Sequence, residues 1–449
     1  MVRPLWIGAV LALVLAALSL FLPYLPVYDP WGWLVWGREL TRLDLATADG
    51  LSWKPLPVLI DAPLSLLGDD AAPKAWLLVA RGGWLLAPLL AGWLAVRLVG
   101  EETGRWRFVA AAIAAGSVAL TGDSFTPPTR QFSGGLSEPL LVALALGAVA
   151  AALARRPGLA LWLGVAASLL RPECWPFLAL WALLAVRAEP RLRRQAVTAA
   201  VLIPFAWFVP DLLGAGDPLA GSENARGGPV EPGEALEVLG RALAAPLAAA
   251  WLGVALFLAQ RDREDERDRA LMVLLAGAAT WTVLVAAMAV IGYAGLPRFL
   301  APASAAVAIV GGVGVARAGA RARAGGAARP LLSAATLFAL LVAVAGFALR
   351  AAEVPGDLRQ VDRQAALTEG MFAIVDGLGP ARLTSCGAKV RLANLLTPPT
   401  ALAWRMDRPL ASVRVIAHPR YGVALSTRPL PGKLLTRVGR WRASQRPCF

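Results

Sequence analysis

The chain has 449 residues, of which 57% are hydrophobic and 16% are charged, and its mean hydropathy is +0.60. Soluble globular proteins have about 45–50% apolar and about 25% charged residues, so this composition excludes an ordinary soluble protein and a disordered one. Three cysteines are too few for a disulfide-rich secreted scaffold. The net charge of +14 would indicate a nucleic-acid partner in a soluble chain, but in a polytopic membrane protein its position along the chain decides its meaning.

Eleven apolar runs are long enough, or nearly so, to cross about 30 Å of hydrocarbon. They lie at residues 5–23, 75–99, 107–121, 136–154, 158–171, 173–187, 196–213, 237–259, 270–293, 299–317 and 329–349. The runs predict an all-α polytopic membrane bundle. The first run resembles a signal peptide but has no small-residue cleavage site, so we interpret it as an uncleaved span. Pro172 either divides two crossings or kinks one long helix.

The basic residues between these runs alternate along the chain. If the N-terminus is cytoplasmic, the inner segments carry 18 arginines and the outer connections carry 8 basic residues. Cytoplasmic loops of membrane proteins are enriched in Lys and Arg. The sequence therefore predicts a multi-pass cell-membrane protein with a cytoplasmic N-terminus, and eleven crossings place its C-terminus outside the cytoplasm.

The first outer loop, residues 24–74, holds the densest aromatic and charged segment. Trp33 and Trp36 lie on one face of a predicted interfacial helix, with Asp29 at its N-cap and Pro30 at its first position. An Asp before Pro is often only a cap. A carboxylate ringed by tryptophans at the lipid surface is also well placed to act as a base toward a sugar hydroxyl, and indole rings stack on sugar faces.

Two further charged residues begin predicted helices near the same outer surface. Lys54 starts a second interfacial segment, where it either binds a phosphate or anchors to lipid headgroups. Glu138 follows Ser137 at the start of the run at 136–154. A Glu in a first turn ordinarily complements the helix dipole. Here it is also a secondary catalytic or metal-binding candidate.

Two arginines lie beside prolines at the outer ends of apolar runs. Arg171 and Glu173 flank Pro172, and they either pair with each other or with Asp211, or leave the guanidinium to bind a lipid phosphate. Arg298 follows a Gly-rich segment and contacts either lipid headgroups or a phosphate. Because charged residues within membrane proteins are costly, their gathering at the outer face predicts a polar chamber that opens there.

The last hundred residues hold 16 basic and 6 acidic residues and so supply +10 of the net charge. A helical stretch at 359–377 and extended stretches at 382–386, 413–417 and 423–426 predict a small α+β domain. We divide the chain into a transmembrane domain at 1–349 and an extracytoplasmic domain at 350–449. Cys386 and Cys448 lie on the oxidising side and can pair. The positive charge suits an anionic partner outside the membrane or anionic lipid, so nucleic acid is not needed to explain the charge.

Several chemistries are excluded by the residues present. The single histidine, His418, and three scattered cysteines give no zinc site of ordinary spacing and no Ser-His-Asp arrangement within the membrane. No P-loop motif occurs. A divalent metal is possible but not indicated.

The layout resembles the GT-C superfamily, integral-membrane glycosyltransferases that use polyprenyl-phosphate sugars, such as the bacterial mannosyl- and arabinosyltransferases. The resemblance covers residues 1–349. It is carried by an aspartate in a long first outer loop with interfacial helices, an Arg-Pro-Glu between middle helices, and a Gly-Tyr-x-Gly-x-x-Arg-Phe-x-x-Pro near the end of the bundle, followed by a C-terminal outer domain.

The resemblance implies roles for individual residues. Asp29 corresponds to the family's first-loop acid and would be the general base of an inverting transfer. Arg171 and Arg298 would hold the donor phosphate, with Glu173 orienting them. The commoner form of the family has paired acids, whereas Pro30 follows Asp29 here, which puts metal binding in doubt.

The implied function is transfer of a sugar from a polyprenyl-phosphate donor to an extracytoplasmic glycan, lipid or protein acceptor. The alternative is a lipid or glycolipid transporter or a non-catalytic membrane scaffold. A transporter would show matched half-repeats, broken helices and polar groups at mid-depth, whereas a scaffold would have no outer-facing cavity at Asp29.

Overall fold

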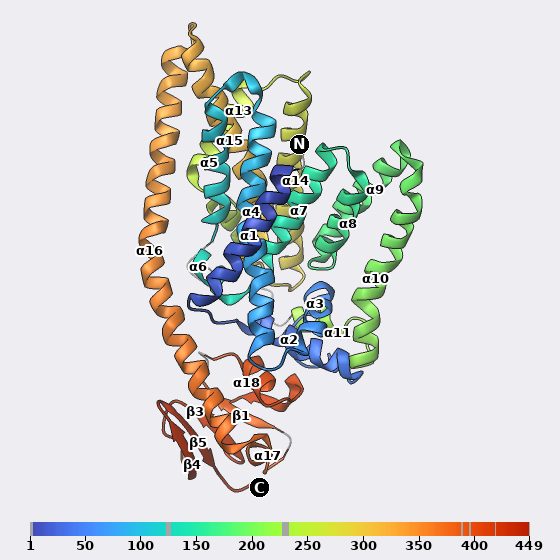
Figure 1. Ribbon diagram of the computed structural model, residues 1–449, viewed down its shortest axis with the longest axis vertical. Helices are drawn as coiled ribbons and strands as arrows, with labels where there is room; N and C mark the ends of the chain where they lie inside the picture. Colours follow the sequence, from blue (N-terminus) through green and yellow to red (C-terminus); the bar gives the residue numbers. More distant parts are fainter. Residues whose placement is uncertain are drawn as a thin grey trace.

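A computed structural model of the chain describes residues 3–122, 127–226, 233–387, 389–394, 397–417 and 419–448, so His418 lies outside the described residues. The molecule is an elongated bundle of helices with a small sheet at one end (Figure 1). The N-terminus lies in the half of the molecule away from this sheet, and the C-terminus lies beside it.

The helices occur in the following order along the chain: α1 (Arg3–Leu18), α2 (Tyr28–Arg42), α3 (Pro55–Ser65), α4 (Ala71–Val99), α5 (Trp106–Ala119), α6 (Pro128–Gly134), α7 (Glu138–Leu153), α8 (Pro157–Ser168), α9 (Trp175–Ala188), α10 (Arg193–Ala215), α11 (Ala220–Ala225), α12 (Glu234–Ala244), α13 (Ala248–Gln260), α14 (Glu266–Val290), α15 (Ala301–Ala324), α16 (Arg329–Leu378), α17 (Pro380–Leu383) and α18 (Pro399–Arg405). Short 3₁₀ turns connect several of them, including η3 (Pro172–Cys174) and η5 (Pro297–Leu300).

The chain is a multi-pass membrane protein by the length and apolar character of its helices. Five helices among the described residues are long and apolar enough to cross a membrane, and the number rises to seven if two bent pairs each count as one span. Three shorter apolar helices, α1, α5 and α8, fall below that length. The predicted count of eleven crossings is therefore not reached on these criteria.

Two predicted spans differ in detail from the helices that form. The run at 237–259 is not one straight helix, because α12 and α13 meet at 83°. Pro246 lies between them, and proline cannot continue a helical hydrogen-bond ladder. The runs on either side of Pro172 form two separate helices, α8 and α9, joined by η3.

Helix α15 is the buried centre of the bundle and contacts α4, α5, α7, α13, α14 and α16. Its Gly- and Ala-rich sequence permits this close packing. A Cβ added at Gly311 would lie 2.3 Å from the carbonyl oxygen of Ala250 in α13, so only glycine fits there. Close backbone approach through small residues is typical of helix packing in membranes.

Helix α16 runs without a break through residue 349, where the sequence separates the two predicted domains. Its apolar part ends before Arg350, whose guanidinium donates to the carbonyl of Gly122 at 3.1 Å. The C-terminal part of α16 then packs against the sheet. The C-terminal domain is thus joined to the bundle by a continuous helix.

The C-terminal sheet has five strands: β1 (Val390–Ala393), β2 (Val413–Val415), β3 (Val423–Ser426), β4 (Lys433–Val438) and β5 (Trp441–Gln445). Their order is β2-β1-β3-β5-β4; β1 is parallel to β2 and β3, and the other pairs are antiparallel. The strands predicted near 413 and 423 are confirmed. The extended stretch predicted at 382–386 is wrong, because Pro380 begins the short helix α17 there.

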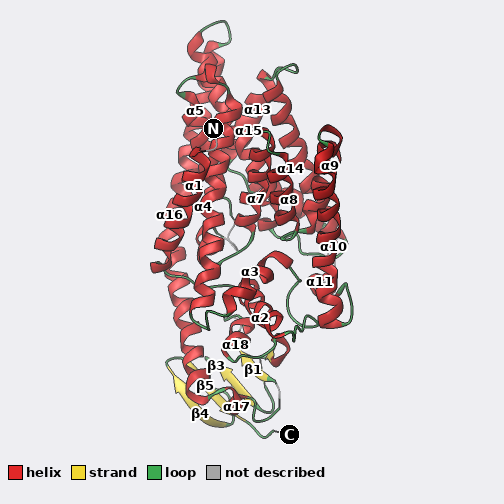
Figure 2. Ribbon diagram, turned by 45° about the vertical axis from the view of Figure 1, so that its right-hand side comes forward, coloured by secondary structure: helices red, strands yellow, loops and turns green. Residues whose placement is uncertain are grey.

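The inner face of the sheet and the first outer loop share one hydrophobic core. Val390, Leu392 and Leu425 from the sheet join Trp33 and Trp36 of α2 in this cluster, together with residues of α16 and α18. Figure 2 shows α2, α3 and α18 between the bundle and the sheet. The C-terminal domain therefore packs directly on the loop that carries Asp29.

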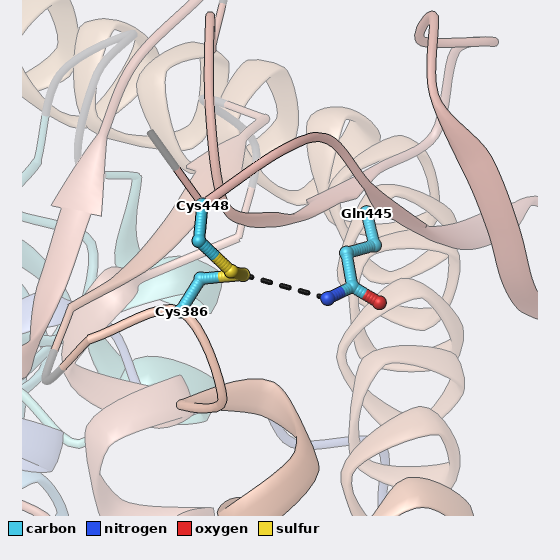
Figure 3. The surroundings of a disulfide bond; sticks show 3 residues. All are labelled: Cys386, Gln445 and Cys448. Atoms are coloured by element: carbon cyan, nitrogen blue, oxygen red, sulfur yellow. Dashed lines mark hydrogen bonds between the residues drawn. A yellow bond between two sulfur atoms is a disulfide. The ribbon is translucent and has the colours of Figure 1, made fainter.

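Cys386 and Cys448, which were expected to be able to pair, form a disulfide across 62 residues of sequence. The side-chain amide of Gln445 donates to the sulfur of Cys386 at 3.4 Å (Figure 3). The bond ties the loop after α17 to the end of the chain. Cys174, which is buried, is free.

Candidate active site

Six charged side chains predicted from the sequence meet at the end of the bundle that faces the C-terminal domain. Asp29 comes from the first turn of α2 and Lys54 from the residue before α3. Glu138 begins α7. Arg171 and Glu173 belong to the connection between α8 and α9, and Arg298 belongs to η5.

The local sequence explains why these residues stand at helix starts. Pro30, Pro55, Pro139 and Pro172 each directly follow one of the charged residues, and Pro297 precedes Arg298. Proline is favoured in the first turn of a helix and restricts the residue before it. Lys54 and Arg171 accordingly have extended backbones and act as helix caps. Their side chains therefore leave the helix at its end.

Glu138 lies at the centre of the charged cluster. Its Oε1 accepts from Arg171 at 3.0 Å, and it lies 3.4 Å from Nε of Arg298 and 4.0 Å from Nζ of Lys54. Arg171 also donates to Glu173 at 3.1 Å. Three cations thus converge on one carboxylate oxygen, and Arg171 makes the predicted ion pair with Glu173 but not with Asp211.

Asp29 is the acid of this cluster that a ligand can reach. Its side chain is 19% exposed, against 1% for Glu138 and 2% for Glu173. Its Oδ2 lies 3.4 Å from Arg298 and 4.0 Å from Lys54. Glu138 neutralises and aligns the cations, whereas Asp29 faces open space.

That open space is a cavity of about 460 Å³. Asp29, Lys54, Arg171, Glu173 and Arg298 line one part of it. Six aromatic side chains also line it, together with aliphatic and small polar residues; the aromatic ones are Trp53, Trp175, Trp207, Phe208, Tyr293 and Phe299. A cavity with a charged part and an aromatic part suits a ligand with an anionic group and a flat or apolar body.

Several charged atoms beside the cavity lack a hydrogen-bond partner among the described residues. They include Nε of Arg171 and one carboxylate oxygen each of Glu138 and Glu173. Burial lowers the pKa of Lys54 because it disfavours the ammonium, an effect that Glu138 opposes. Unsatisfied buried polar groups are costly. Of these atoms, Nε of Arg171 is a donor that an anion could use, whereas the two carboxylate oxygens are acceptors.

The aromatic wall is held in position by hydrogen bonds from the indole nitrogens. Trp53 donates to the carbonyl of Ala206 at 2.9 Å, and Trp207 donates to the carbonyl of Ser168 at 2.9 Å. Arg171 stacks 3.4 Å from the ring centre of Phe299. The wall is therefore rigid on the side where the charged residues lie.

Trp33 and Trp36 were predicted to contact the substrate, and this prediction is wrong. Both are fully buried and neither lines the cavity. The C-terminal domain and α3 cover α2, so the face that the sequence assigned to the membrane interface is a protein core. Lys54 lies 5.0 Å over the Trp33 ring, and Trp36 packs on Trp53. These indoles thus support residues of the site.

Asp29 was predicted to be the N-cap of its helix, but Val27 occupies that position and Asp29 lies in the first turn. The carbonyl of the preceding residue, Tyr28, accepts from the hydroxyl of Thr400 in α18 at 2.9 Å. Because Asp29 does not cap the helix with its side chain, that carboxylate is left to face the cavity.

Part of the cavity lining was not predicted from the sequence, including Trp207, Phe208 and Ser222. Trp207 and Phe208 lie near the C-terminal end of an apolar run, and aromatic residues are common at the ends of such runs. Asp211, which also lines the cavity, accepts from the backbone of Gly221 at 2.8 Å.

The described residues contain no group of three His, Cys, Asp or Glu side chains suited to a metal ion.

No protein-family model matches the sequence, and no curated protein sequence matches it. The fold is similar to that of ArnT from Cupriavidus metallidurans, as seen in a crystal structure of its apo state. The similarity covers 97% of each chain, with a TM-score of 0.53 and 16% sequence identity. ArnT is a GT-C glycosyltransferase, so the resemblance in fold that the sequence indicated is confirmed. At this identity the likeness concerns the fold alone.

Proposed function

We propose that the protein is a membrane glycosyltransferase of the GT-C type that transfers a sugar from a polyprenyl-phosphate donor to an extracytoplasmic acceptor. The observation that carries this proposal is the accessible carboxylate of Asp29 beside three cations, the buried Lys54 and Arg171 and the partly exposed Arg298, in one cavity with aromatic lining. The acceptor is a glycan, lipid or protein that presents a hydroxyl group. The cavity is lined by residues at one end of the described helices, which favours an enzyme over a transport path.

Lys54, Arg171 and Arg298 bind the phosphate of the donor in this proposal. The convergence of their nitrogens on one oxygen of Glu138 supports it, because a phosphate beside them would receive several charge-assisted hydrogen bonds. Glu138 and Glu173 act as positioning residues. The polyprenyl chain lies toward the lipid, and the sugar lies against the aromatic wall.

The reaction is an inverting displacement at the anomeric carbon. The acceptor hydroxyl attacks that carbon, its proton passes to the carboxylate of Asp29, and the bond from the carbon to the phosphate oxygen breaks. Negative charge grows on the departing lipid phosphate as the bond breaks. Arg171, Arg298 and Lys54 stabilise this charge, which is larger in the transition state than in the bound donor.

The topology belongs to the same proposal. Helices α1, α4, α5, α7, α8, α9, α10, α13, α14, α15 and α16 make eleven crossings, with α12 in the interface. The N-terminus is cytoplasmic, and the active site and the C-terminal domain are extracytoplasmic. The distribution of 18 inner arginines against 8 outer basic residues supports this orientation.

Replacing Asp29 by Asn tests the assignment of the base. The amide keeps the size of the side chain but cannot take a proton, so sugar transfer by purified protein should fall about 10²–10⁴-fold. Asp49→Asn, a change at an exposed acid of the same loop, is the matched control and should retain activity. Equal activity of the Asp29 variant and wild type would remove Asp29 from the mechanism.

Metal removal tests the role given to the three cations. If they supply the positive charge that the departing phosphate requires, transfer should survive prolonged treatment with a chelator, with less than about a twofold change. A loss that added Mg²⁺ or Mn²⁺ restores would show that a metal ion takes part.

A further inference from the structure

The C-terminal sheet carries a row of arginines on one face. Arg414 of β2 pairs in register with Arg391 of β1, and Arg437 of β4 pairs in register with Arg442 of β5. Ser426 of β3 lies opposite Arg442. Successive side chains of a strand point to opposite faces. These residues therefore share one face, opposite the apolar face that packs on α16.

Little in the domain neutralises this face. Residues 389–446 contain twelve basic residues and one acidic residue, Asp407. Asp407 is already paired with Arg38 at 3.0 Å and Arg42 at 2.7 Å, both in α2. No basic residue after position 408 forms an ion pair with a described acidic residue. The charge of the sheet is therefore left for a partner.

Arg391, beside Arg414 on the neighbouring strand, is the most buried arginine of the row. Arg391 is 8% exposed and stacks 4.1 Å from the ring centre of Tyr421. Its Nη1 is buried and has no hydrogen-bond partner among the described residues. Because that nitrogen is buried, Arg391 adds positive charge behind the face, and the exposed arginines beside it are the ones that a carboxylate or phosphate can reach. Arg414 and Arg437 at the flanking strands are exposed, and Arg442 is half-buried.

The position of the sheet argues against lipid as the partner. Trp441 of β5 donates to the carbonyl of Leu367, which lies eighteen residues beyond Leu349 in the continuous helix α16. At a rise of 1.5 Å per residue this is about 27 Å along the helix axis. A tilt of about 40° would leave about 21 Å. Electrostatic attraction to a membrane surface is screened over about 8 Å at physiological salt.

We propose that this arginine-bearing face of the C-terminal sheet binds an extended anionic polymer with repeated carboxylate or phosphate groups, outside the membrane. Neighbouring strands are about 4.8 Å apart, so the row from β2 to β4 extends over about 19 Å, which suits a chain with charges along its length rather than a single ion. This proposal depends on the proposed function in one respect, which is that the sheet lies on the extracytoplasmic side of the membrane. The sheet shares a core with α2, so a polymer bound here would lie close to the loop that carries Asp29.

The test measures binding of fluorescent polygalacturonate to the full chain in lipid nanodiscs, with neutral dextran of the same size as the control polymer. The variant Arg414→Gln/Arg437→Gln/Arg442→Gln should weaken binding about tenfold, as expected for the loss of three solvent-accessible charge contacts. Arg359→Gln/Arg363→Gln/Arg382→Gln removes the same charge from exposed positions of the same domain outside the sheet, and it should change the affinity less than about threefold. Added salt should weaken binding of the wild-type protein.

Several results would overturn the proposal. The first is that the sheet variant binds the polymer as tightly as the wild-type protein. The second is that both triple variants lose the same affinity. The third is that the arginine-bearing face of the C-terminal sheet binds phosphatidylglycerol vesicles but not the polymer. Unchanged melting temperatures verify that the variants are folded. Because the assay needs no donor, a failure here leaves sugar transfer untouched, and an inactive Asp29→Asn protein should still bind the polymer.

Discussion

Two groups of buried charges lie at opposite ends of the bundle and differ in how completely they are satisfied. At the end away from the sheet, Arg317 of α15 pairs with Asp268 of α14 and donates to the carbonyls of Val99 at 3.1 Å and Leu98 at 3.0 Å. The second oxygen of Asp268 accepts from the backbone of Asp262 at 2.7 Å. Each of these charged groups is used within the protein.

The cluster around Glu138 is different. Arg171, Glu138 and Glu173 each keep an atom without a partner among the described residues, and the cluster borders a cavity of about 460 Å³. Both groups place arginines beside carboxylates in an apolar bundle, and their chemistry is similar. An ion pair whose atoms all have hydrogen-bond partners stabilises the packing of the helices. An ion pair that borders a cavity and keeps unpartnered atoms can still bind a ligand. Mutations that separate stability from activity can test this distinction.

Among the mutations that compare the two groups of charges, the largest expected effect is on catalysis at Arg298. Arg298→Gln removes a cation that contacts both Asp29 and Glu138, and it should lower kcat/KM for sugar transfer by about 10²–10³-fold, as for the loss of one donor to a developing oxyanion. Arg298→Lys keeps the charge and should retain more activity. A glutamine variant with full kcat/KM would show that the cluster is structural like the pair at the other end.

The complementary change is Asp268→Asn at the saturated pair. It leaves Arg317 buried with a weaker partner and should lower the free energy of unfolding by about 3–5 kcal/mol. Transfer activity per folded molecule should remain close to that of wild type. Thermal unfolding in detergent, measured beside the activity of the folded fraction, checks both parts. A stable but inactive variant would contradict the structural role.

The comparison also shows what the sequence could predict. Asp29, Lys54, Arg171 and Arg298 could be found because charged residues in an apolar chain are few, and their positions at run ends place them at one face of the membrane. Their convergence could have been predicted more firmly from the prolines that follow four of the site residues. An X-Pro pair at a helix start directs the preceding side chain out of the helix end.

The environment of Trp33 and Trp36 could not be predicted in the same way. Their spacing on one helix face is the same whether lipid or protein covers that face. Here the covering comes from α18 and the sheet, which lie more than 350 residues later in the chain. Long-range packing of this kind leaves no local pattern. The strands β4 and β5 were also missed, because Lys, Thr, Arg, Ser and Gln make up half or more of their residues, so neither resembles a buried strand.

Glu39 in α2 is intermediate between the Arg317–Asp268 pair and the cluster around Glu138, because only one of its carboxylate oxygens has a partner. Its replacement should have the smallest effect of the changes considered. Its Oε2 accepts from the backbone of Ala46 at 3.0 Å, whereas its buried Oε1 has no partner among the described residues. Burial raises its pKa to about 7 from an ordinary value near 4.5. The folded state therefore holds a proton that the unfolded state releases, so stability should fall as the pH rises from about 4.5 to 7 and then level off.

The loss from this one group is at most about 3 kcal/mol, at 1.36 kcal/mol for each unit of pKa difference. Glu39→Gln cannot ionise and should make the melting temperature less dependent on pH over this range. Asp61, fully buried in α3, also has a raised pKa and contributes a slope of the same sign, so some dependence should remain. A steeper slope in the glutamine variant would mean that Glu39 is ionised in the folded protein and is satisfied by its neighbours, as Asp268 is at the other end of the bundle.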